Sequence, residues 1–220
     1  MSRTFECSTP EQRASGLAAA AEALRAGQLV VLPTDTLYGI GADAFTPAAV
    51  AALLAAKGRG RDMPVPVLVG SLNTVDGLVG TVTPQLRGLI EAFWPGALTI
   101  VVRHAPSLSW DLGDTGGSVA LRMPLHPVAL ALLRETGPLA VSSANRTGFD
   151  PAATATQARE QLGESVAVYL DAGPVAEPLA STIVDLTGPA PIVRRVGAVS
   201  IAQLGALLPD LTGSEPGRLA

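Results

Sequence analysis

The chain has 220 residues, of which 48% are hydrophobic and 15% are charged, and its formal net charge at pH 7 is -4. This length supports a sizeable core, and the negative net charge argues against a protein that coats nucleic acid with its whole surface. No run of about 18 apolar residues predicts a membrane span, and charged residues interrupt the first 30, so we expect a cytoplasmic protein without a secretory signal.

Short apolar runs alternate with alanine-rich stretches of helical character, and Gly and Pro separate them, which is typical of an α/β protein. Thr-Pro or His-Pro pairs combine an N-cap residue with proline at the first helical position, so they predict helix starts at residues 10, 47, 84 and 127. The first two helices are expected to end at Gly27 and Gly58. Strands are expected over residues 28–33, 65–70, 97–103, 118–122, 139–143, 166–171, 181–186 and 191–196.

The chain shows no change of composition and no flexible linker before residue 205. We therefore predict one domain over residues 1–205, followed by a tail over residues 206–220 that is expected to be partly disordered. Cysteine and histidine are scarce, since Cys7, His104 and His126 are the only ones. An internal disulfide, a zinc site or a Ser-His-Asp hydrolase is therefore not expected, and no metal ligands are assigned.

The sequence GIGADA at 39–44 matches the GxGxxA pattern of dinucleotide-binding loops, and Asp62 follows about 20 residues later. The context disagrees, because a polar stretch separates the motif from the preceding strand and the next helix begins only at residue 47. A Walker A loop is absent as well, because no Gly-Lys pair precedes Ser or Thr. Neither nucleotide-binding fingerprint is expected.

The sequence KGRGRD at 57–62 places Lys57, Arg59 and Arg61 close together, and Lys57 is the only lysine among 15 Lys and Arg residues. A solvated charged loop would have the same composition. The alternative is an anion site, because a compact ammonium contacts a phosphate or carboxylate at one point and the glycines expose backbone N–H groups.

Polar clusters also stand at the ends of predicted strands, in residues 33–36, 122–124, 142–148 and 181–185. Each cluster alone is ordinary turn chemistry, since Asn, Asp, Gly and Thr suit turns and caps. Their recurrence at strand ends favours a shared polar cleft, because side chains beyond the ends of neighbouring strands can converge.

Seven motifs follow one another along the chain: VVLPTDTLYGIGADAF (30–45), the Lys-x-Arg of KGR (57–59), FWPGALTIVV (93–102), LRMPLHPVALALL (121–133), VSSANRTG (141–148), STIVDLTG (181–188) and RRVG (194–197). In their order and spacing, these motifs resemble the YrdC family. The resemblance covers residues 10–205 and implies a single α/β domain with a twisted, mixed β-sheet flanked by helices around a concave basic cleft.

The chain looks like the short bacterial L-threonylcarbamoyladenylate synthases of that family, which are nucleotidyltransferases. The resemblance implies that L-threonine, bicarbonate or CO2, and ATP form threonylcarbamoyl-AMP and pyrophosphate. Downstream threonylcarbamoyl-transfer proteins then use the product to make N6-threonylcarbamoyladenosine at tRNA position 37. Mg²⁺ is expected with the ATP, and Asp35 is the nearest candidate carboxylate.

The resemblance also assigns roles to residues. Lys57, Arg59, Ser143 and Asn145 match its Lys-x-Arg and Ser-x-Asn motifs and are the expected catalytic residues. Two binding sets are expected: for threonine Thr34, Thr36, Arg122 and Ser181, and for ATP Arg59, Arg61, Ser118, Ser143 and Arg195.

The sequence departs from the family pattern at three positions. Met63 stands where many members have lysine, Leu68 where some have histidine, and Ser142 where proline is common. Arg61 is near enough to replace the charge missing at Met63, which is one reason to expect it at ATP.

A non-catalytic RNA-binding module is the alternative, since the same basic cleft could hold an RNA backbone. The aromatic content is only 4% and no aromatic run offers a stacking surface for bases, which favours the enzyme.

Overall fold

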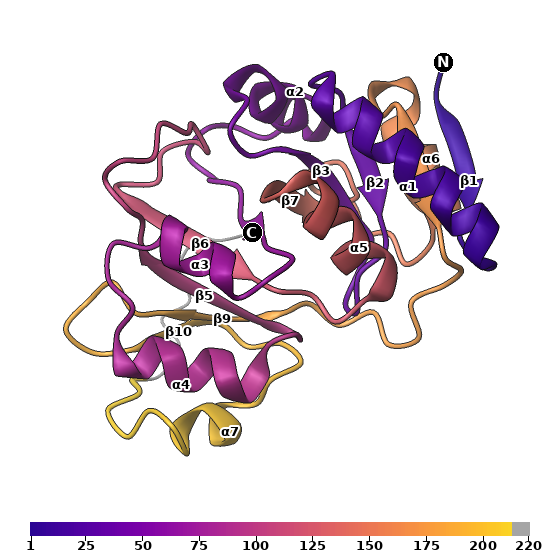
Figure 1. The fold of residues 1–220 in the computed structure, drawn as a ribbon. Helices are drawn as coiled ribbons and strands as arrows, with labels where there is room; N and C mark the ends of the chain where they lie inside the picture. The colour runs from indigo at the N-terminus through magenta and orange to yellow at the C-terminus, as the bar shows by residue number, and fades with distance from the viewer. Residues whose placement is uncertain (213–220) are drawn as a thin grey trace.

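A computed structural model describes residues 1–212, and Figure 1 shows its strands and helices. One ten-stranded sheet has the order β1-β8-β2-β3-β7-β4-β6-β5-β9-β10. The strands are β1 Arg3–Glu6, β2 Val30–Leu32, β3 Gly39–Asp43, β4 Val67–Leu68, β5 Leu98–Arg103, β6 Ser118–Arg122, β7 Leu139–Ser143, β8 Val168–Asp171, β9 Thr182–Asp185 and β10 Ile192–Arg195. The helices are α1 Pro10–Arg25, α2 Pro47–Lys57, α3 Asn73–Leu78, α4 Pro84–Phe93, α5 Pro127–Thr136, α6 Ala155–Leu162, the 3-10 turn η1 Gly163–Ser165 and α7 Ile201–Gly205.

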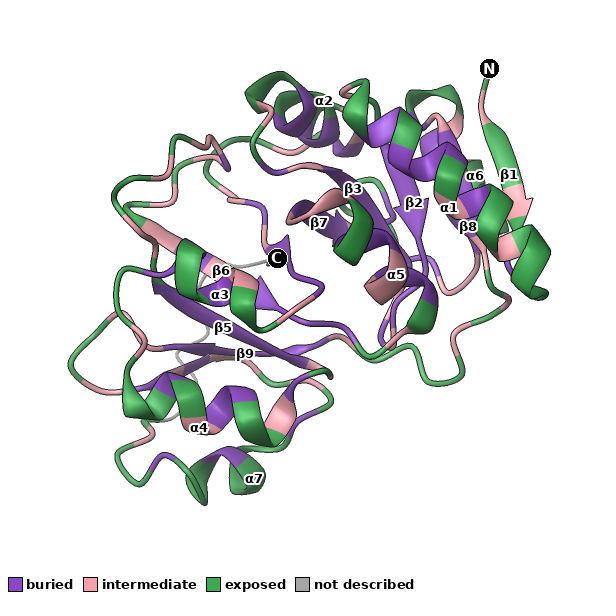
Figure 2. Ribbon diagram, in the orientation of Figure 1, coloured by how far each residue is buried: buried purple, intermediate pink, exposed green. Residues whose placement is uncertain are grey.

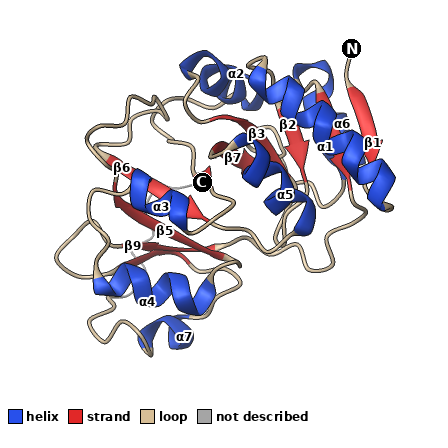
Figure 3. Cartoon of the chain, in the orientation of Figure 1, coloured by secondary structure: helices blue, strands red, loops and turns tan. Residues whose placement is uncertain are grey.

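The sheet is mixed, as expected. β8 pairs in parallel with both β1 and β2, whereas β3 runs antiparallel to its neighbours β2 and β7. Farther along, β6 is parallel to β4 and antiparallel to β5. The predicted α/β domain with a mixed sheet and flanking helices is confirmed (Figure 3).

The half of the sheet formed by β1, β8, β2, β3 and β7, which we call the β2 half, has helices on both faces. Side chains alternate along each strand, so apolar residues on both faces need a helix to pack against. Val30 and Leu32 of β2 pack in one apolar cluster with α1 and α5, while Val31 between them belongs to the other cluster, with α2. The first cluster is tight because α1 supplies alanines and Gly16, whose added Cβ would lie 3.0 Å from the side chains of Phe5 and Leu170.

The other half of the sheet, formed by β4, β6, β5, β9 and β10, is called the β5 half, and one of its faces packs in the larger apolar cluster, which also contains Val31 and α2. Leu98, Ile100 and Val102 of β5 pack with Leu86 and Leu89 of α4. Figure 2 shows α4 with buried residues on one side and exposed residues on the other. The opposite face of β5, β6 and β9 carries both polar and apolar residues, and these line the site described below.

All four predicted helix starts are confirmed, at Pro10, Pro47, Pro84 and Pro127. Thr9 caps α1 reciprocally with Gln12, as a capping box does. Residues 39–44, which match the GxGxxA pattern, mostly form β3 between β2 and β7, so they are not a phosphate-binding loop.

The sequence analysis did not predict β1, β3, α3, α6 or α7. Each is short, and β3 contains two glycines, so its sequence lacks the continuous apolar run that predicted the other buried strands. Residues 206–212 pack against the domain, since Leu208 is buried and the Thr212 amide donates to the carbonyl of Pro191. The rest of the expected tail, 213–220, lies outside the described residues. Within residues 1–212, no helix has the length and apolarity needed to span a bilayer.

Gly70 follows β4 where the backbone of α5 comes closest. A Cβ at this position would lie 2.7 Å from both the Arg134 nitrogen and the Leu133 carbonyl carbon. We therefore expect Gly70→Ala to lower the free energy of unfolding in urea by about 1–3 kcal/mol. The matched control is Gly88→Ala in α4, where an added Cβ meets nothing within 4 Å. That variant should be more stable by up to about 1 kcal/mol, and equal stability of the two variants would contradict the close approach.

Candidate active site

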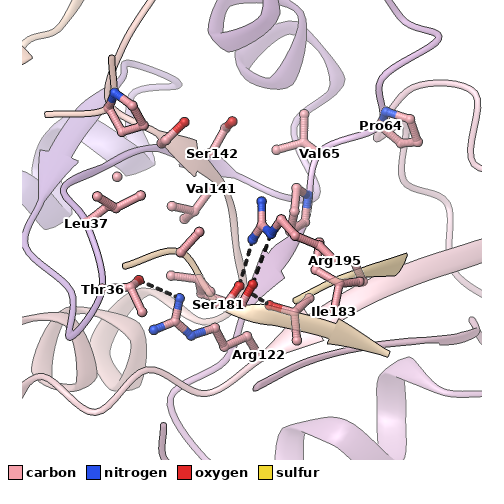
Figure 4. A pocket seen from close by; sticks show the side chains of 18 of the residues that line it. Thr36, Leu37, Pro64, Val65, Arg122, Val141, Ser142, Ser181, Ile183 and Arg195 are labelled. Carbon is pink, nitrogen blue, oxygen red and sulfur yellow. Dashed lines mark hydrogen bonds between the residues drawn. The ribbon is translucent and has the colours of Figure 1, made fainter. Parts of the chain in front are cut away.

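A cavity of about 430 Å³ lies where loops from both halves of the sheet meet. Its floor is one face of β5 and β6, because alternate residues such as Thr99, Val101, Ser118 and Ala120 line it. Figure 4 shows the lining side chains pointing toward one another from separate segments. Ten of the expected site residues line the cavity: Thr34, Thr36, Lys57, Arg59, Ser118, Arg122, Ser143, Asn145, Ser181 and Arg195.

Arg122 is the centre of one buried end of the cavity, which we call the Arg122 end. Its guanidinium donates to Gly96 O at 2.9 Å, to Thr36 Oγ1 at 2.8 Å and to Asp35 Oδ1 at 2.7 Å (Figure 4 draws the Thr36 contact). Thr34 supports this arrangement, because its Oγ1 lies 3.0 Å from Thr36 Oγ1. Asp35 supplies the counter-charge that a buried guanidinium needs, since the Arg122 side chain is only 8% exposed.

Ser181 and Arg195 extend the Arg122 end. The Arg195 guanidinium donates through Nε to the Ser181 carbonyl at 3.0 Å and through Nη2 to its hydroxyl at 3.0 Å (Figure 4). The Ser181 hydroxyl also lies 2.8 Å from Thr99 Oγ1. Thr99 was not predicted, and its only signal in the sequence is that it is a polar residue within the apolar run of β5.

Lys57 is the centre of the other end of the cavity, which we call the Lys57 end. Gly58 ends α2 at a φ of 62°, a left-handed conformation that glycine adopts without strain, so Lys57 is the last helical residue. The Lys57 ammonium donates to the carbonyls of Ser143 and Asn145, each at 2.6 Å, and to Asn145 Oδ1 at 3.3 Å. The Lys57 carbonyl in turn accepts from the Thr147 amide at 2.9 Å.

The burial of Lys57 changes its ionisation. Removal from water, followed by the nearby Arg59 charge, lowers the pKa of Lys57 from 10.5 to about 8. The carbonyl oxygens accept hydrogen bonds from the ammonium, so Lys57 remains mostly charged at neutral pH. All three of its N–H groups are engaged with the Ser-x-Asn segment.

Arg59 follows Lys57 into the cavity. Its Nη1 donates to Ser142 Oγ at 3.1 Å, a contact that the proline common at this position in the family could not make. The Arg59 Nε is buried and meets no acceptor among the described residues. Because an unpaired buried donor costs free energy, this nitrogen favours a ligand that supplies an oxygen.

Arg61 does not line the cavity. It lies on the surface, where it donates to both carboxylate oxygens of Asp111, at 2.9 and 2.8 Å. Ser118 does line the cavity, and its hydroxyl donates to the Thr115 carbonyl at 2.8 Å. Leu68 and Met63 are the two positions after Lys-x-Arg where this sequence departs from the family pattern. Leu68 lines the cavity and Met63 does not.

The electrostatics of the cavity favour anions. Lys57, Arg59, Arg122 and Arg195 line it, and no carboxylate is among its lining residues in the described part of the chain. Burial lowers the pKa of all three arginines, but a guanidinium remains protonated at neutral pH. The arrangement suits a ligand that brings several negative oxygens.

Comparison with known proteins identifies the family. The model of the Sua5/YciO/YrdC family, described as telomere recombination, matches residues 22–197. The chain belongs to this family.

Curated relatives in this family cover nearly the whole chain. A Mycobacterium tuberculosis protein, provisionally named threonylcarbamoyl-AMP synthase, is 63% identical over 94% of this chain and 96% of its own length. The threonylcarbamoyl-AMP synthase of Bacillus subtilis is 35% identical over 93% of this chain, and the aligned region is 59% of that longer protein.

Solved structures in the family have the same fold. Pyrococcus abyssi Sua5 complexed with L-threonine superposes with a TM-score of 0.91 and 28% identity, covering 96% of this chain and 62% of that one. Escherichia coli YciO superposes with a TM-score of 0.82 at 22% identity, covering 93% of this chain and all of that one, which supports the fold alone.

The lowered pKa of Lys57 can be measured directly because Lys57 is the only lysine in the chain. Labelling with ¹³C-lysine gives one Cε resonance, which we expect to titrate with a midpoint of about 8 in the folded protein. The same sample unfolded in urea is the control, with an expected midpoint of about 10.4. An ordinary midpoint in the folded protein would contradict the effect of burial.

Proposed function

We propose that this chain is a threonylcarbamoyl-AMP synthase that forms threonylcarbamoyl-AMP and pyrophosphate from L-threonine, bicarbonate or CO2, and ATP. The observation that carries the proposal is the joining, in one cavity, of the Arg122 end with the Lys57 end. The first suits an amino acid and the second suits phosphates. The naming of relatives that align over more than nine-tenths of the chain supports the same activity.

Threonine would bind at the Arg122 end. A guanidinium has five N–H donors, and Arg122 uses three of them within the described part of the chain. The two that remain would grip the threonine carboxylate, for which the planar guanidinium is well suited. Thr34, Thr36 and Ser181 present hydroxyls that would orient the amine and side chain. The Pyrococcus abyssi relative is complexed with L-threonine, which supports threonine as the substrate.

The triphosphate would bind at the Lys57 end and near Ser118 and Arg195. Arg59 would turn its unpaired Nε toward a phosphate oxygen. Lys57 holds the carbonyls of Ser143 and Asn145 with all its donors, so its role is to fix the Ser-x-Asn segment and to supply positive charge. Ser143 and Asn145 are then positioned beside the reacting groups.

The chemistry needs positioning and charge stabilisation more than a strong base. The threonine amine would attack CO2 and lose a proton, which gives a carbamate. A carbamate oxygen then attacks the α-phosphorus of ATP, and the bond to the bridging oxygen breaks to release pyrophosphate. This is a nucleotidyl transfer, and fixed cations beside the phosphates stabilise the charge that gathers in its transition state. Arg59 and Arg195 are the cations in place for this role.

Mg²⁺ would enter with the ATP as part of the substrate. Asp35 does not fit the role of a metal ligand, because its Oδ1 accepts from Arg122 and from the Leu125 amide and it does not line the cavity. No group of three His, Cys, Asp or Glu side chains that could hold a metal ion occurs within residues 1–212. Phosphate oxygens and water would therefore supply the metal ligands.

An RNA-binding role fits the geometry less well. Lys57 is 3% exposed and Arg122 is 6% exposed, so their charges face an enclosed space. A nucleic-acid backbone needs cations along an open surface. The burial of these charges favours small substrates over RNA.

Release of pyrophosphate by the purified protein tests the proposal. We expect release from ATP and Mg²⁺ only when threonine and bicarbonate are both present, with serine a much poorer substrate. The controls omit each component in turn. Release that does not depend on threonine would exclude the synthase, and salt-sensitive RNA binding without any release would favour the alternative.

The geometry of Lys57 predicts the effect of its closest replacement. Lys57→Arg keeps the charge, but a planar guanidinium cannot direct three N–H groups to the same converging carbonyls in a space this closed. We expect turnover to fall by more than about tenfold, which corresponds to about 1.4 kcal/mol of transition-state stabilisation. Arg87→Lys on the exposed side of α4 is the control and should be normal. Near-normal turnover of Lys57→Arg would show that the ammonium itself is not needed.

A further inference from the structure

Two loops from opposite halves of the sheet contact each other, and both contribute residues to the cavity lining. Figure 1 shows the chain segments after α2 and between β5 and β6 that form them. The first, residues 58–66, follows α2 and contributes Arg59, Pro64, Val65 and Pro66 to the lining. The second, residues 104–117, joins β5 to β6 and contributes Thr115. The position of each loop therefore affects the shape of the site.

An ion-pair cluster on the outer surface connects the two loops. Arg61 donates to both carboxylate oxygens of Asp111, and its Nε lies 3.5 Å from Asp114 Oδ1. Backbone hydrogen bonds follow the same path: the Asp114 amide donates to the Arg61 carbonyl at 2.8 Å, and the Val65 amide donates to the Leu112 carbonyl at 2.9 Å. The two loops are therefore joined both by backbone hydrogen bonds and by the ion pairs of Arg61 with Asp111 and Asp114.

Gly113 permits this close approach. Its φ is 101°, and an added Cβ would lie 2.8 Å from the Arg61 carbonyl oxygen. A second contact anchors the same loop nearby, where Trp110 stacks on Phe45 with ring centroids 5.7 Å apart. Phe45 precedes α2 and Arg61 follows it, so loop 104–117 contacts the chain on both sides of α2 in the sequence.

We propose that Arg61, through its ion pairs with Asp111 and Asp114, is a positioning residue that holds these two loops together as one rim of the nucleotide site. Arg59 belongs to the first loop and Thr115 to the second, so the contact between the loops sets the distance between two residues that line the cavity. The inference rests on the proposed function, because ATP is the ligand whose binding reports the closure.

A direct contact between Arg61 and ATP makes the opposite prediction. If Arg61 bound a phosphate, removing the charges of Asp111 and Asp114 would free it and tighten ATP binding. If Arg61 positions the rim, removing either side of the ion pair opens the same contact and weakens binding. The acidic partners therefore distinguish the two roles.

The test compares Arg61→Ala, the double variant Asp111→Asn/Asp114→Asn and the triple variant that combines them. We expect each of the first two to raise the Kd of a non-hydrolysable ATP analogue and the KM for ATP by about three- to fivefold, with kcat nearly unchanged. The triple variant should be no weaker than either, because all three lose one shared contact. Tighter binding by the Asp variants, or wild-type binding by all three, would overturn the proposal.

A matched control and a second readout complete the design. Arg25→Ala removes another exposed ion pair, to Glu135 at 3.0 Å, at a site that does not line the cavity, so it should leave ATP binding unchanged. Trp110 fluorescence in a Trp94→Phe background should shift to the red in Arg61→Ala but not in Arg25→Ala, because the loop that carries Trp110 loses its ion-pair anchor and exposes the indole more to water. Failure of the wild type to bind any nucleotide would count against the proposed function, and an unchanged Trp110 emission would separately refute the rim.

Discussion

The burial of the Lys57 ammonium imposes a requirement that the rest of the site satisfies. A charge removed from water needs fixed oxygen partners, and here the carbonyls of Ser143 and Asn145 provide them. Those carbonyls can converge only if the chain turns sharply after β7, and that turn places the Ser-x-Asn side chains at the cavity. Asn145 also ties the turn to itself, because its Nδ2 donates to the Phe149 carbonyl at 2.7 Å. One ionic requirement thus connects the end of a helix with the end of a strand.

The Arg122 end obeys the same rule with different chemistry. The Arg122 guanidinium is balanced by Asp35 and by neutral oxygens, whereas Arg195, which extends this end, donates to the uncharged Ser181. The Arg122 end therefore combines two arginines with one carboxylate, and the Lys57 end presents Lys57 and Arg59 with no carboxylate among the described lining residues. A zwitterionic amino acid and a polyanionic nucleotide would each find a suitable environment within the same space.

The sequence predicted helix ends and strands correctly where neighbouring residues alone determine the local structure. Proline at N1 located four helix starts, Gly58 located the end of α2, and short apolar runs located most strands. β3 was missed because its sequence, GIGAD, contains two glycines and an aspartate and so lacks the continuous apolar run that predicted buried strands such as β2. In the candidate site, motifs indicated ten lining residues, but no local signal revealed that Arg61 turns outward to Asp111 or that Asp35 pairs with Arg122. Those partners are distant in sequence, so their contacts depend on the completed fold.

The contacts that shape the cavity have a consequence for how it forms. Lys57 and Asn145 are separated by 88 positions, Thr36 and Arg122 by 86, and Thr99 and Ser181 by 82. Closing such long segments of chain has an entropic cost that only the assembled sheet offsets. The Lys57 end joins α2 with the end of β7 in one half of the sheet, and Thr99 and Ser181 belong to the other half, whereas the Thr36–Arg122 hydrogen bond crosses between the halves. Binding of a ligand that needs both ends of the cavity therefore reports that both halves have folded and joined.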